Sequence, residues 1–360
     1  MFRPLLVAAL LSSGSAFAAP PAKPAAKADT AAPAKPAASA KPAEAVKPEA
    51  APAPVATATP VATAIVIPAA IVGPQRALIR LEVLLDRAHF SPGVIDGKDG
   101  SNLKLAMAAY AQANGGGAAT PEALTDKLVA SDKQSTVTRY TITDADVAGP
   151  FVDKLPTDMT ELAKLDKLAF SGPVEALAER FHMDEALLKA LNPAADFTKA
   201  GSEITVAAVG KAKLPAAVTR IEVDKTANAV RAFGADGKLL AAYPATVGSQ
   251  ERPAPDGTWK VRTVATNATY TFDPKRLTFG DPGKGKLTIK AGPNNPIGTT
   301  WIALTKETYG IHGSPDPRLI GKRASHGCVR LTNWDIEQLA AAVKAGAEVV
   351  FTGTEQKAKT

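Results

Sequence analysis

The sequence predicts a multidomain α+β protein in which a small helical module and a βααβ module precede a β-rich C-terminal domain. Two observations lead to this prediction. Apolar residues recur at helical spacing as far as about Leu191, whereas from Val218 onward they alternate with polar residues as in half-buried strands. The C-terminal domain, residues 216–353, is therefore expected to be a mixed β-sandwich or barrel with one short helix.

Residues 1–18 have the layout of a secretory signal peptide. Arg3 precedes the apolar run Leu5–Leu11, and Ala16–Ala18 offers small residues on either side of a cleavage position. A buried N-terminal helix is the less favoured alternative, because the run is short and opens onto a Pro-rich tract. No other stretch reaches the ~20 apolar residues that a membrane span needs. We therefore expect an exported protein of the periplasm or cell wall, without a membrane span.

Residues 19–72 are dominated by Ala, Pro and Lys and contain no aromatic residue, which predicts a disordered, extended tether. Residues 354–360 are expected to form a short tail. The formal net charge of +7 is mild for 360 residues, and the lysines of the tether are spaced rather than blocked. This charge permits attraction to anionic envelope polymers, and we expect no nucleic-acid partner.

Residues 74–130 are expected to form the small helical module. Apolar side chains repeat at helical spacing in Leu78–Ala88 and again in Leu103–Ala113, on either side of a turn. Asp96 and Asp99 of this turn have the wrong spacing for an EF-hand, so no calcium loop is predicted. The order of a leucine-rich helix, a Pro-Gly turn, Asp-Gly and a helix with Ala and an aromatic residue resembles the peptidoglycan-binding domain of helical type.

Residues 166–210 read as a strand, two helices and a second strand. Ser171–Pro173 and Asp184 suit the starts of the two helices. Asn192-Pro193 ends the second helix, and 201–206 alternates like a strand. This order resembles the lysin motif, which binds glycans that contain N-acetylglucosamine. The chain departs from that motif at its first helix, where Ser-Gly-Pro replaces the usual Gly-Asp-Thr.

The C-terminal domain begins with the alternating strand Val218–Asp224. Near its end, a helical stripe that includes Val343 is expected to be capped by Thr332 or Asn333 and stopped by Gly346. Residues 348–351 then form a last strand. The segment that contains the chain's single cysteine therefore joins a strand to a helix.

That cysteine, Cys328, lies in a Ser-His-Gly-Cys-Val-Arg block downstream of His312. A free thiol has a pKa near ~8.5, so an imidazole that takes its proton makes it a better nucleophile. His326 leaves the same face of an extended chain as Cys328, whereas His312 must be brought near by the fold. Gly327 allows neighbouring backbone N–H groups to point at one spot and hold an oxyanion. These parts suit acyl transfer through a thioester.

Three alternatives compete with this interpretation of the sequence. A zinc site of His312, His326 and Cys328 would need Asp316 as its fourth ligand. A buried, unreactive Cys328 is disfavoured because polar residues adjoin it in the sequence. The glycine-rich segment 280–286 imitates a phosphate loop, but a strand follows it and the required Ser or Thr is missing. No metal is therefore expected.

The block that follows His312 resembles the signature of the L,D-transpeptidase catalytic domain family. Further landmarks of that domain match at Ile221–Asp224, Tyr243–Gly248, Pro255–Trp259 and Asn295–Gly298. The resemblance implies Cys328 as the nucleophile and His312 as its base, oriented by the carbonyl group of Gly313. Supporting and oxyanion roles fall to Ser325, His326 and Gly327. Arg330 stands where many members have Asn, and its guanidinium suits a peptide carboxylate.

The implied substrate is the stem peptide of peptidoglycan, and the implied reaction forms cross-links in cell wall biogenesis and so contributes to cell shape. No cofactor is implied, and we expect a monomer. The acyl acceptor stays open between a second stem peptide, an envelope lipoprotein, a free D-amino acid and water. Two alternatives also stay open, namely a non-catalytic cell-wall binding protein and an L,D-carboxypeptidase that uses water.

Overall fold

The structure is a computed structural model that describes Pro68 and residues 71–117, 120–210, 213–249, 253–275, 285–322 and 327–355. The predicted signal peptide, the C-terminal tail after residue 355 and nearly all of the tether lie outside the described residues, as do Ser325 and His326. The described residues all fall in one compact unit. None of the helices in the described ranges combines the length and the apolar character of a membrane span.

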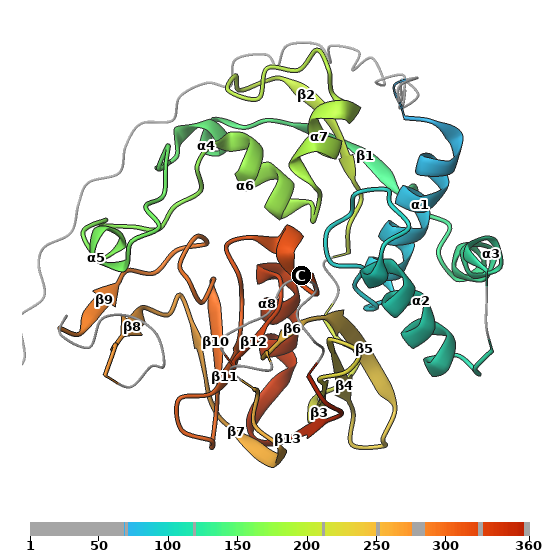
Figure 1. Cartoon of the computed structure of the whole chain (residues 1–360). Coiled ribbons are helices and arrows are strands. Elements are labelled where there is room, and N and C mark those ends of the chain that lie inside the picture. Colours follow the sequence, from blue (N-terminus) through green and yellow to red (C-terminus); the bar gives the residue numbers. More distant parts are fainter. Residues whose placement is uncertain are drawn as a thin grey trace, which may run out of the picture. The chain divides into compact units, whose positions relative to one another are not determined.

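A nine-stranded sheet forms the C-terminal domain, with the strand order β5-β4-β3-β13-β7-β10-β11-β12-β6 among the described residues (Figure 1). Its strands are β3 (Val218–Asp224), β4 (Ala229–Phe233), β5 (Leu239–Pro244), β6 (Thr246–Val247), β7 (Gly257–Thr266), β10 (Thr300–Leu304), β11 (Gly310–His312), β12 (Val329–Arg330) and β13 (Val343–Thr352). The pairs β11–β12 and β13–β3 are parallel, and the other neighbours are antiparallel. The predicted multidomain α+β class with a β-rich C-terminal domain is confirmed.

One helix, α8 (Asn333–Ala342), packs into the core of this sheet through Ile336 and Leu339. Thr332 caps it by accepting a hydrogen bond from the backbone N–H of Asp335. The expectation that the helical stripe continues through Val343 to a stop at Gly346 is wrong. The β-branched side chain of Val343 already belongs to β13, where it is buried opposite Val218, and Gly346 lies in the following bulge.

The N-terminal helical module contains both predicted helices, α1 (Gly73–Arg87) and α2 (Ser101–Ala113), and a third helix that we did not predict, α3 (Pro121–Ser131). Thr120 caps α3, and Pro121 stands at its first position. The three helices share one apolar cluster, which also includes Ala242 of β5. The module therefore packs on the edge of the large sheet.

The βααβ module contains α6 (Pro173–Arg180), α7 (Glu185–Leu191) and β2 (Glu203–Ala207). The expected strand directly before α6 is wrong. The antiparallel partner of β2 is β1 (Val137–Thr141), which is far upstream in the sequence. The long connection between β1 and α6 carries two short helices, α4 (Asp144–Ala148) and α5 (Met159–Leu162).

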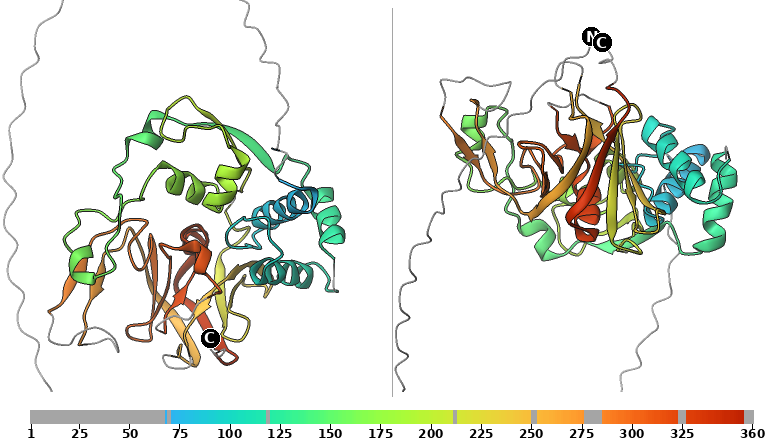
Figure 2. Two further views of the ribbon diagram at one scale, coloured as in Figure 1. Left: turned by 45° about the horizontal axis from the view of Figure 1, so that its top comes forward. Right: turned by 90° about the horizontal axis from the view of Figure 1, so that it is seen from below.

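A two-stranded hairpin, β8 (Tyr270–Phe272) and β9 (Leu287–Ile289), projects from the C-terminal domain and meets α5. Both views in Figure 2 keep α5 beside this hairpin. Leu162, Leu168, Phe272 and Ile289 are buried together where they meet. The connection that precedes α6 therefore supports the hairpin through apolar packing.

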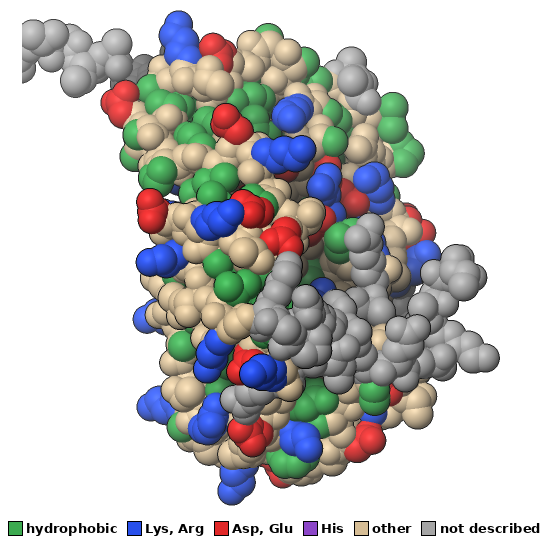
Figure 3. Space-filling model, turned by 60° about the vertical axis from the view of Figure 1, so that its left-hand side comes forward, with side chains coloured by type: hydrophobic (Ala, Val, Ile, Leu, Met, Phe, Trp, Pro, Cys, Tyr) green, Lys and Arg blue, Asp and Glu red, His purple; other side chains and the backbone are tan. Residues whose placement is uncertain are grey.

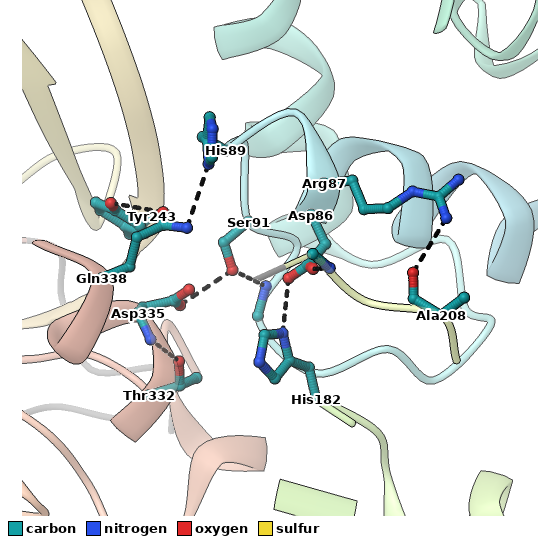
Figure 4. Close-up of polar contacts among 12 residues, drawn as sticks. Asp86, Arg87, His89, Ser91, His182, Ala208, Tyr243, Thr332, Asp335 and Gln338 are labelled. Carbon is teal, nitrogen blue, oxygen red and sulfur yellow. Dashed lines mark hydrogen bonds and ion pairs between the residues drawn. The ribbon is translucent and has the colours of Figure 1, made fainter. Parts of the chain in front are cut away.

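Polar contacts join both N-terminal modules to the start of α8 (Figure 4). Ser91 donates to Asp335 over 3.0 Å. His182 lies 2.9 Å from Asp86, and its ring stacks on Trp334 with the ring centres 4.9 Å apart. The start of α8 is thus the meeting point of three parts of the chain. The one short 3₁₀ helix of the described residues, η1 (Pro317–Leu319), lies in the loop that follows β11.

Basic and acidic side chains are interspersed on the face that Figure 3 shows, with hydrophobic side chains scattered between them. Neither sign of charge gathers there into one continuous field. This face therefore lacks the basic stripe that tracks a nucleic-acid backbone.

Candidate active site

The parallel pairing of β11 and β12 aligns the two segments that carry the predicted base and nucleophile. Ile311 pairs with Val329, and His312 pairs with Arg330. Because side chains alternate along a strand, His312, Arg330 and Cys328 share one face. Ile311 and Val329 point the other way and are buried in the core of the domain. The register of the two strands thus places His312 opposite Arg330, two residues after Cys328.

His312 is held in one tautomer by its neighbour in the chain. Its Nδ1 atom lies 2.7 Å from the carbonyl oxygen of Gly313. A carbonyl oxygen only accepts hydrogen bonds, so in the neutral ring Nδ1 carries the proton and Nε2 carries the lone pair. The ring also stacks on Trp301, with the ring centres 5.3 Å apart. The carbonyl group of Gly313 therefore contacts the ring at the atom through which it can orient the imidazole.

The imidazole of His312 is neutral at physiological pH. The side chain is 3% exposed, and this burial, with a contribution from the charge of Arg330, lowers its pKa to about 3. Backbone hydrogen bonds with Gly313 and Ile297 act in the opposite direction, with smaller effect. A neutral Nε2 is the form that can accept a proton.

Cys328 is half-buried at the start of β12, and its sulfur lies 3.9 Å from the carbonyl oxygen of Thr308. Burial raises the pKa of the thiol, while a hydrogen bond with the backbone of Gly310 and the charge of Arg330 oppose this shift. At neutral pH the pair is thus a thiol and a neutral imidazole, not a thiolate and an imidazolium. A proton must leave the sulfur when the sulfur attacks.

Gly327 precedes the cysteine in a conformation that favours glycine, with φ of 107°. A Cβ atom there would also lie 3.2 Å from the ring of Tyr309 and 3.3 Å from the carbonyl oxygen of Pro253. Both the backbone angle and the space select glycine. Ser325 and His326 lie outside the described residues, so their supporting roles remain predictions.

Arg330 lies on this face of the large sheet, and Tyr270 of the separate β8–β9 pair lies near enough to interact electrostatically with Cys328 and Arg330. The Nε atom of Arg330 is buried and has no hydrogen-bond partner among the residues that the structure describes. Tyr270, on β8, was not predicted. Burial raises its pKa to about 12, the charge of Cys328 adds to this shift, and Arg330 opposes it. Strand alternation was the only signal for Tyr270, and it does not distinguish a side chain of the site from one of the core.

The zinc alternative includes His326, which lies outside the described residues, so it stays untested. The described ranges contain no group of three His, Cys, Asp or Glu side chains arranged to hold a metal ion. Asp316, its proposed fourth ligand, instead lies 3.5 Å from the guanidinium of Arg318. The described face of the site is equipped for nucleophilic chemistry by Cys328.

Comparison with known families supports this reading. Residues 218–351 match the family model of the L,D-transpeptidase catalytic domain. A putative L,D-transpeptidase of Bacillus licheniformis is 37% identical over 87 residues, which cover 23% of this chain and 52% of that protein. A probable L,D-transpeptidase of Escherichia coli, ErfK/SrfK, is 28% identical over 184 residues, or 49% of this chain and 58% of that protein. The chain thus spans roughly half the length of these curated relatives.

Solved structures give only weak likenesses. An L,D-transpeptidase from Mycobacterium smegmatis is 20% identical, covers 42% of this chain and 64% of its own, and has a TM-score of 0.31. One from Enterococcus faecium is 22% identical, covers 49% and 64%, and has a TM-score of 0.29. TM-scores this low do not support an identification, which rests instead on the family model and the sequence relatives. The C-terminal segment, residues 218–351, belongs to the L,D-transpeptidase catalytic domain family.

Proposed function

We propose that this protein is a cysteine-dependent L,D-transpeptidase that acts on the stem peptides of peptidoglycan. The observation that supports this most strongly is the strand register, which gives Cys328 and His312 a common face inside the segment that matches the family. The Nδ1 contact with Gly313 supports Nε2 of His312 as the atom that takes the proton of the thiol, because it leaves the lone pair of the neutral ring on Nε2.

In the first step, the sulfur of Cys328 attacks the carbonyl carbon between the third residue of a stem peptide, a diamino acid, and the fourth, D-alanine. A C–S bond forms as Nε2 of His312 takes the proton from the sulfur. Nε2 then gives this proton to the nitrogen of D-alanine as the C–N bond breaks. The backbone N–H groups of Gly327 and Cys328 stabilise the oxyanion between these events.

In the second step, an amine attacks the thioester and loses a proton to Nε2 of His312. The C–S bond breaks, and the sulfur of Cys328 recovers a proton from the imidazole. A side-chain amine of a second stem peptide gives a cross-link. An envelope lipoprotein or a free D-amino acid gives an attached product, and water gives hydrolysis.

Arg330 has a place in this scheme as the binding group for a substrate carboxylate. Within the described part of the chain, its Nε has no acceptor, although it is buried on the same face as the nucleophile. A buried guanidinium without a full set of acceptors favours an anionic ligand. The carboxylate of the terminal D-alanine of the donor peptide is such a ligand.

The remaining parts of the proposal concern location. We propose that the protein is exported to the periplasm or cell wall, and that the helical module and the βααβ module bind peptidoglycan strands. The exposed surface in Figure 3, with its mixed charges, is compatible with a polar polymer as a partner.

The test is mass spectrometry of peptidoglycan fragments incubated with the full chain, beside Cys328→Ala as the matched control. We expect loss of D-alanine, an acyl adduct on the Cys328 peptide and a product that contains the acceptor. Products made by Cys328→Ala would refute the thioester scheme. Release of D-alanine with water as the only acceptor would establish the carboxypeptidase instead. Sedimentation with cell walls without any acyl adduct would favour the non-catalytic binding protein.

A further inference from the structure

The side chain of Asn333, the first residue of α8, joins segments from two different modules. Its Oδ1 atom accepts a hydrogen bond from the backbone N–H of Thr299 over 3.0 Å. Its Nδ2 atom donates to the carbonyl oxygen of Pro293 over 3.1 Å and to Oε1 of Glu179 over 2.6 Å. Asn333 is 2% exposed, so water cannot readily replace these partners.

The amide of Asn333 also lies directly against two glycines. A Cβ atom on Gly298 or on Gly313 would overlap its Oδ1 atom, and a Cβ atom on Gly298 would overlap the backbone of Gly313 as well. The backbone N–H of Gly313 donates to Thr300 over 3.1 Å. The peptide that follows His312 is therefore enclosed by the side chain of Asn333 and the 298–300 backbone.

This enclosure reaches the candidate base through one hydrogen bond. The carbonyl oxygen of Gly313 is the acceptor that sets the tautomer of His312. A shift of Gly313 changes the direction of this acceptor and so frees the ring to rotate or to change tautomer. The position of Nε2 thus depends on Asn333.

Glu179 acts with Thr299 and Pro293 to determine which way round the Asn333 amide lies. It belongs to α6 of the βααβ module, outside the segment 218–351. Since a carboxyl oxygen and the Pro293 carbonyl both accept from Nδ2, the oxygen end of the amide must face the N–H of Thr299. A flipped amide would set its NH₂ group against that N–H and leave buried groups unpaired.

We propose that Asn333 and Glu179 are positioning residues for the catalytic base. Glu179 fixes the amide of Asn333, Asn333 holds Gly313, and Gly313 orients His312. The inference rests on the proposed function only in taking His312 as the base of Cys328. It makes the βααβ module a structural part of the active site as well as a candidate binding module.

The first test reads the histidine ring directly. Long-range proton–nitrogen NMR spectra of the full chain, labelled with nitrogen-15 in histidine, distinguish the two neutral tautomers. We expect His312 of the wild type in the single Nδ1-protonated form and a mixture of tautomers in Asn333→Ala and Glu179→Ala. Glu179→Gln should restore the single form, because its carboxamide oxygen still accepts from Asn333. Glu185→Ala is the matched control, since Glu185 pairs with Lys189 within its own helix.

The second test reads acylation of the single cysteine by p-nitrophenyl acetate, followed as p-nitrophenolate release and as an acetyl adduct on the Cys328 peptide. We expect Glu179→Ala to slow the maximal acylation rate about tenfold, with the half-saturating concentration unchanged. Glu179→Gln and Glu185→Ala should stay within about twofold of the wild type. The conservative variant separates positioning from a general loss of structure.

The inference is overturned if Glu179→Ala keeps a single His312 tautomer and the wild-type rate, if Glu179→Gln fails to rescue, or if Glu185→Ala is slowed equally. If circular dichroism shows that Asn333→Ala is unfolded, the two Glu179 variants decide the question alone. A wild type that acetylates Cys328 but leaves peptidoglycan unchanged would refute the proposed substrate. The tautomer and acylation comparisons would still test Glu179.

Discussion

His312 donates a hydrogen bond from Nδ1 to the carbonyl oxygen of Gly313, the next residue in the chain, over 2.7 Å. The direct contact of the proposed base is therefore with a backbone carbonyl group. This makes the site sensitive to backbone position around Gly313 and insensitive to the ionisation of a third catalytic group.

The first prediction concerns Gly313 itself. Gly313→Ala should lower the acylation rate of Cys328 about a hundredfold, because the new Cβ overlaps Asn333 and displaces the acceptor of His312. The measurement is p-nitrophenyl acetate acylation, with the fold checked by circular dichroism. Gly100→Ala is the control, since nothing lies within 4 Å of a Cβ atom at that position. A normal rate in Gly313→Ala would show that the Gly313 carbonyl is dispensable.

The charge of Arg330 should be visible in the titration of His312. Arg330→Gln removes a positive charge that disfavours the imidazolium, so the pKa of His312 should rise from about 3. Burial is the larger cause and persists, so the pKa should stay below the ordinary value near ~6.5. An NMR titration of the histidine rings checks this. An unchanged or lower pKa would contradict the placement of Arg330 beside His312.

Carboxylate binding gives a separate prediction for the same side chain. Arg330→Lys keeps the charge but loses the planar set of donors, so KM for a donor peptide with a free C-terminal carboxylate should rise about tenfold, with little change in kcat. Steady-state kinetics with a donor amidated at its C-terminus provides the comparison. If KM rises equally for the free and the amidated donor peptide, Arg330 does not recognise the carboxylate.

The contact of the modules with α8 should weaken as pH rises. Burial raises the pKa of Asp335 to about 7, with Asp86 adding to the shift and the hydrogen bonds from Thr332 and Ser91 and the charge of His182 opposing it. Since the unfolded carboxyl titrates near ~3.9, the folded form holds a proton that the unfolded form has lost. The stability that this protonated carboxyl contributes is therefore fully present below pH ~3.9 and is lost as pH rises through 7.

Urea unfolding checks this dependence. From pH 5 to pH 8 the free energy of unfolding of the wild type should fall by on the order of 2 kcal/mol through Asp335. Asp335→Asn should remove most of this slope, because its amide does not titrate. His182, whose pKa is also raised above its ordinary value, adds a loss of the same sign. A wild type that becomes more stable over this range would refute the assignment.

Support of the β8–β9 hairpin by the upstream connection can be tested at Leu168. Leu168→Ala removes a fully buried side chain and should cost about 2–4 kcal/mol. Hydrogen exchange in residues 270–272 and 287–289 should accelerate more than in β3. Leu155→Ala, at the half-buried edge of the same cluster, is the control and should have a smaller effect. Equal protection of the hairpin in Leu168→Ala would show that it is held by other contacts.

The parts of the site that the sequence revealed are those with a local pattern. Cys328, Gly327 and Arg330 stand in one short block, and Gly313 follows His312 directly, so their chemistry could be read before their positions were known. Hydrophobic alternation likewise predicted the β-rich domain. The pairing of His312 with Cys328 needed only the expectation that the fold would bring two strands together.

The parts that the sequence did not reveal depend on distant partners. The sequence did not predict β1, because its partner, β2, lies far downstream. Val343 was assigned to the wrong element because it fits a helical stripe as well as a strand. Glu179 and Tyr270 sit in segments without a chemical motif, and their relation to the site arises only when modules pack. Tertiary contacts, not local propensity, decide such residues.

The parallel register of β11 and β12 separates two properties that evolution can alter independently. Hydrogen bonds between the two strands align the segments that carry the proposed base and nucleophile, whereas the described residues 313–322 belong to the loop that leaves β11. Insertions or substitutions in the middle of that stretch can thus change which acceptor the site admits without disturbing the proton transfer. The loop thus gives protein engineers a stretch of chain to randomise while the register of β11 and β12 is kept constant.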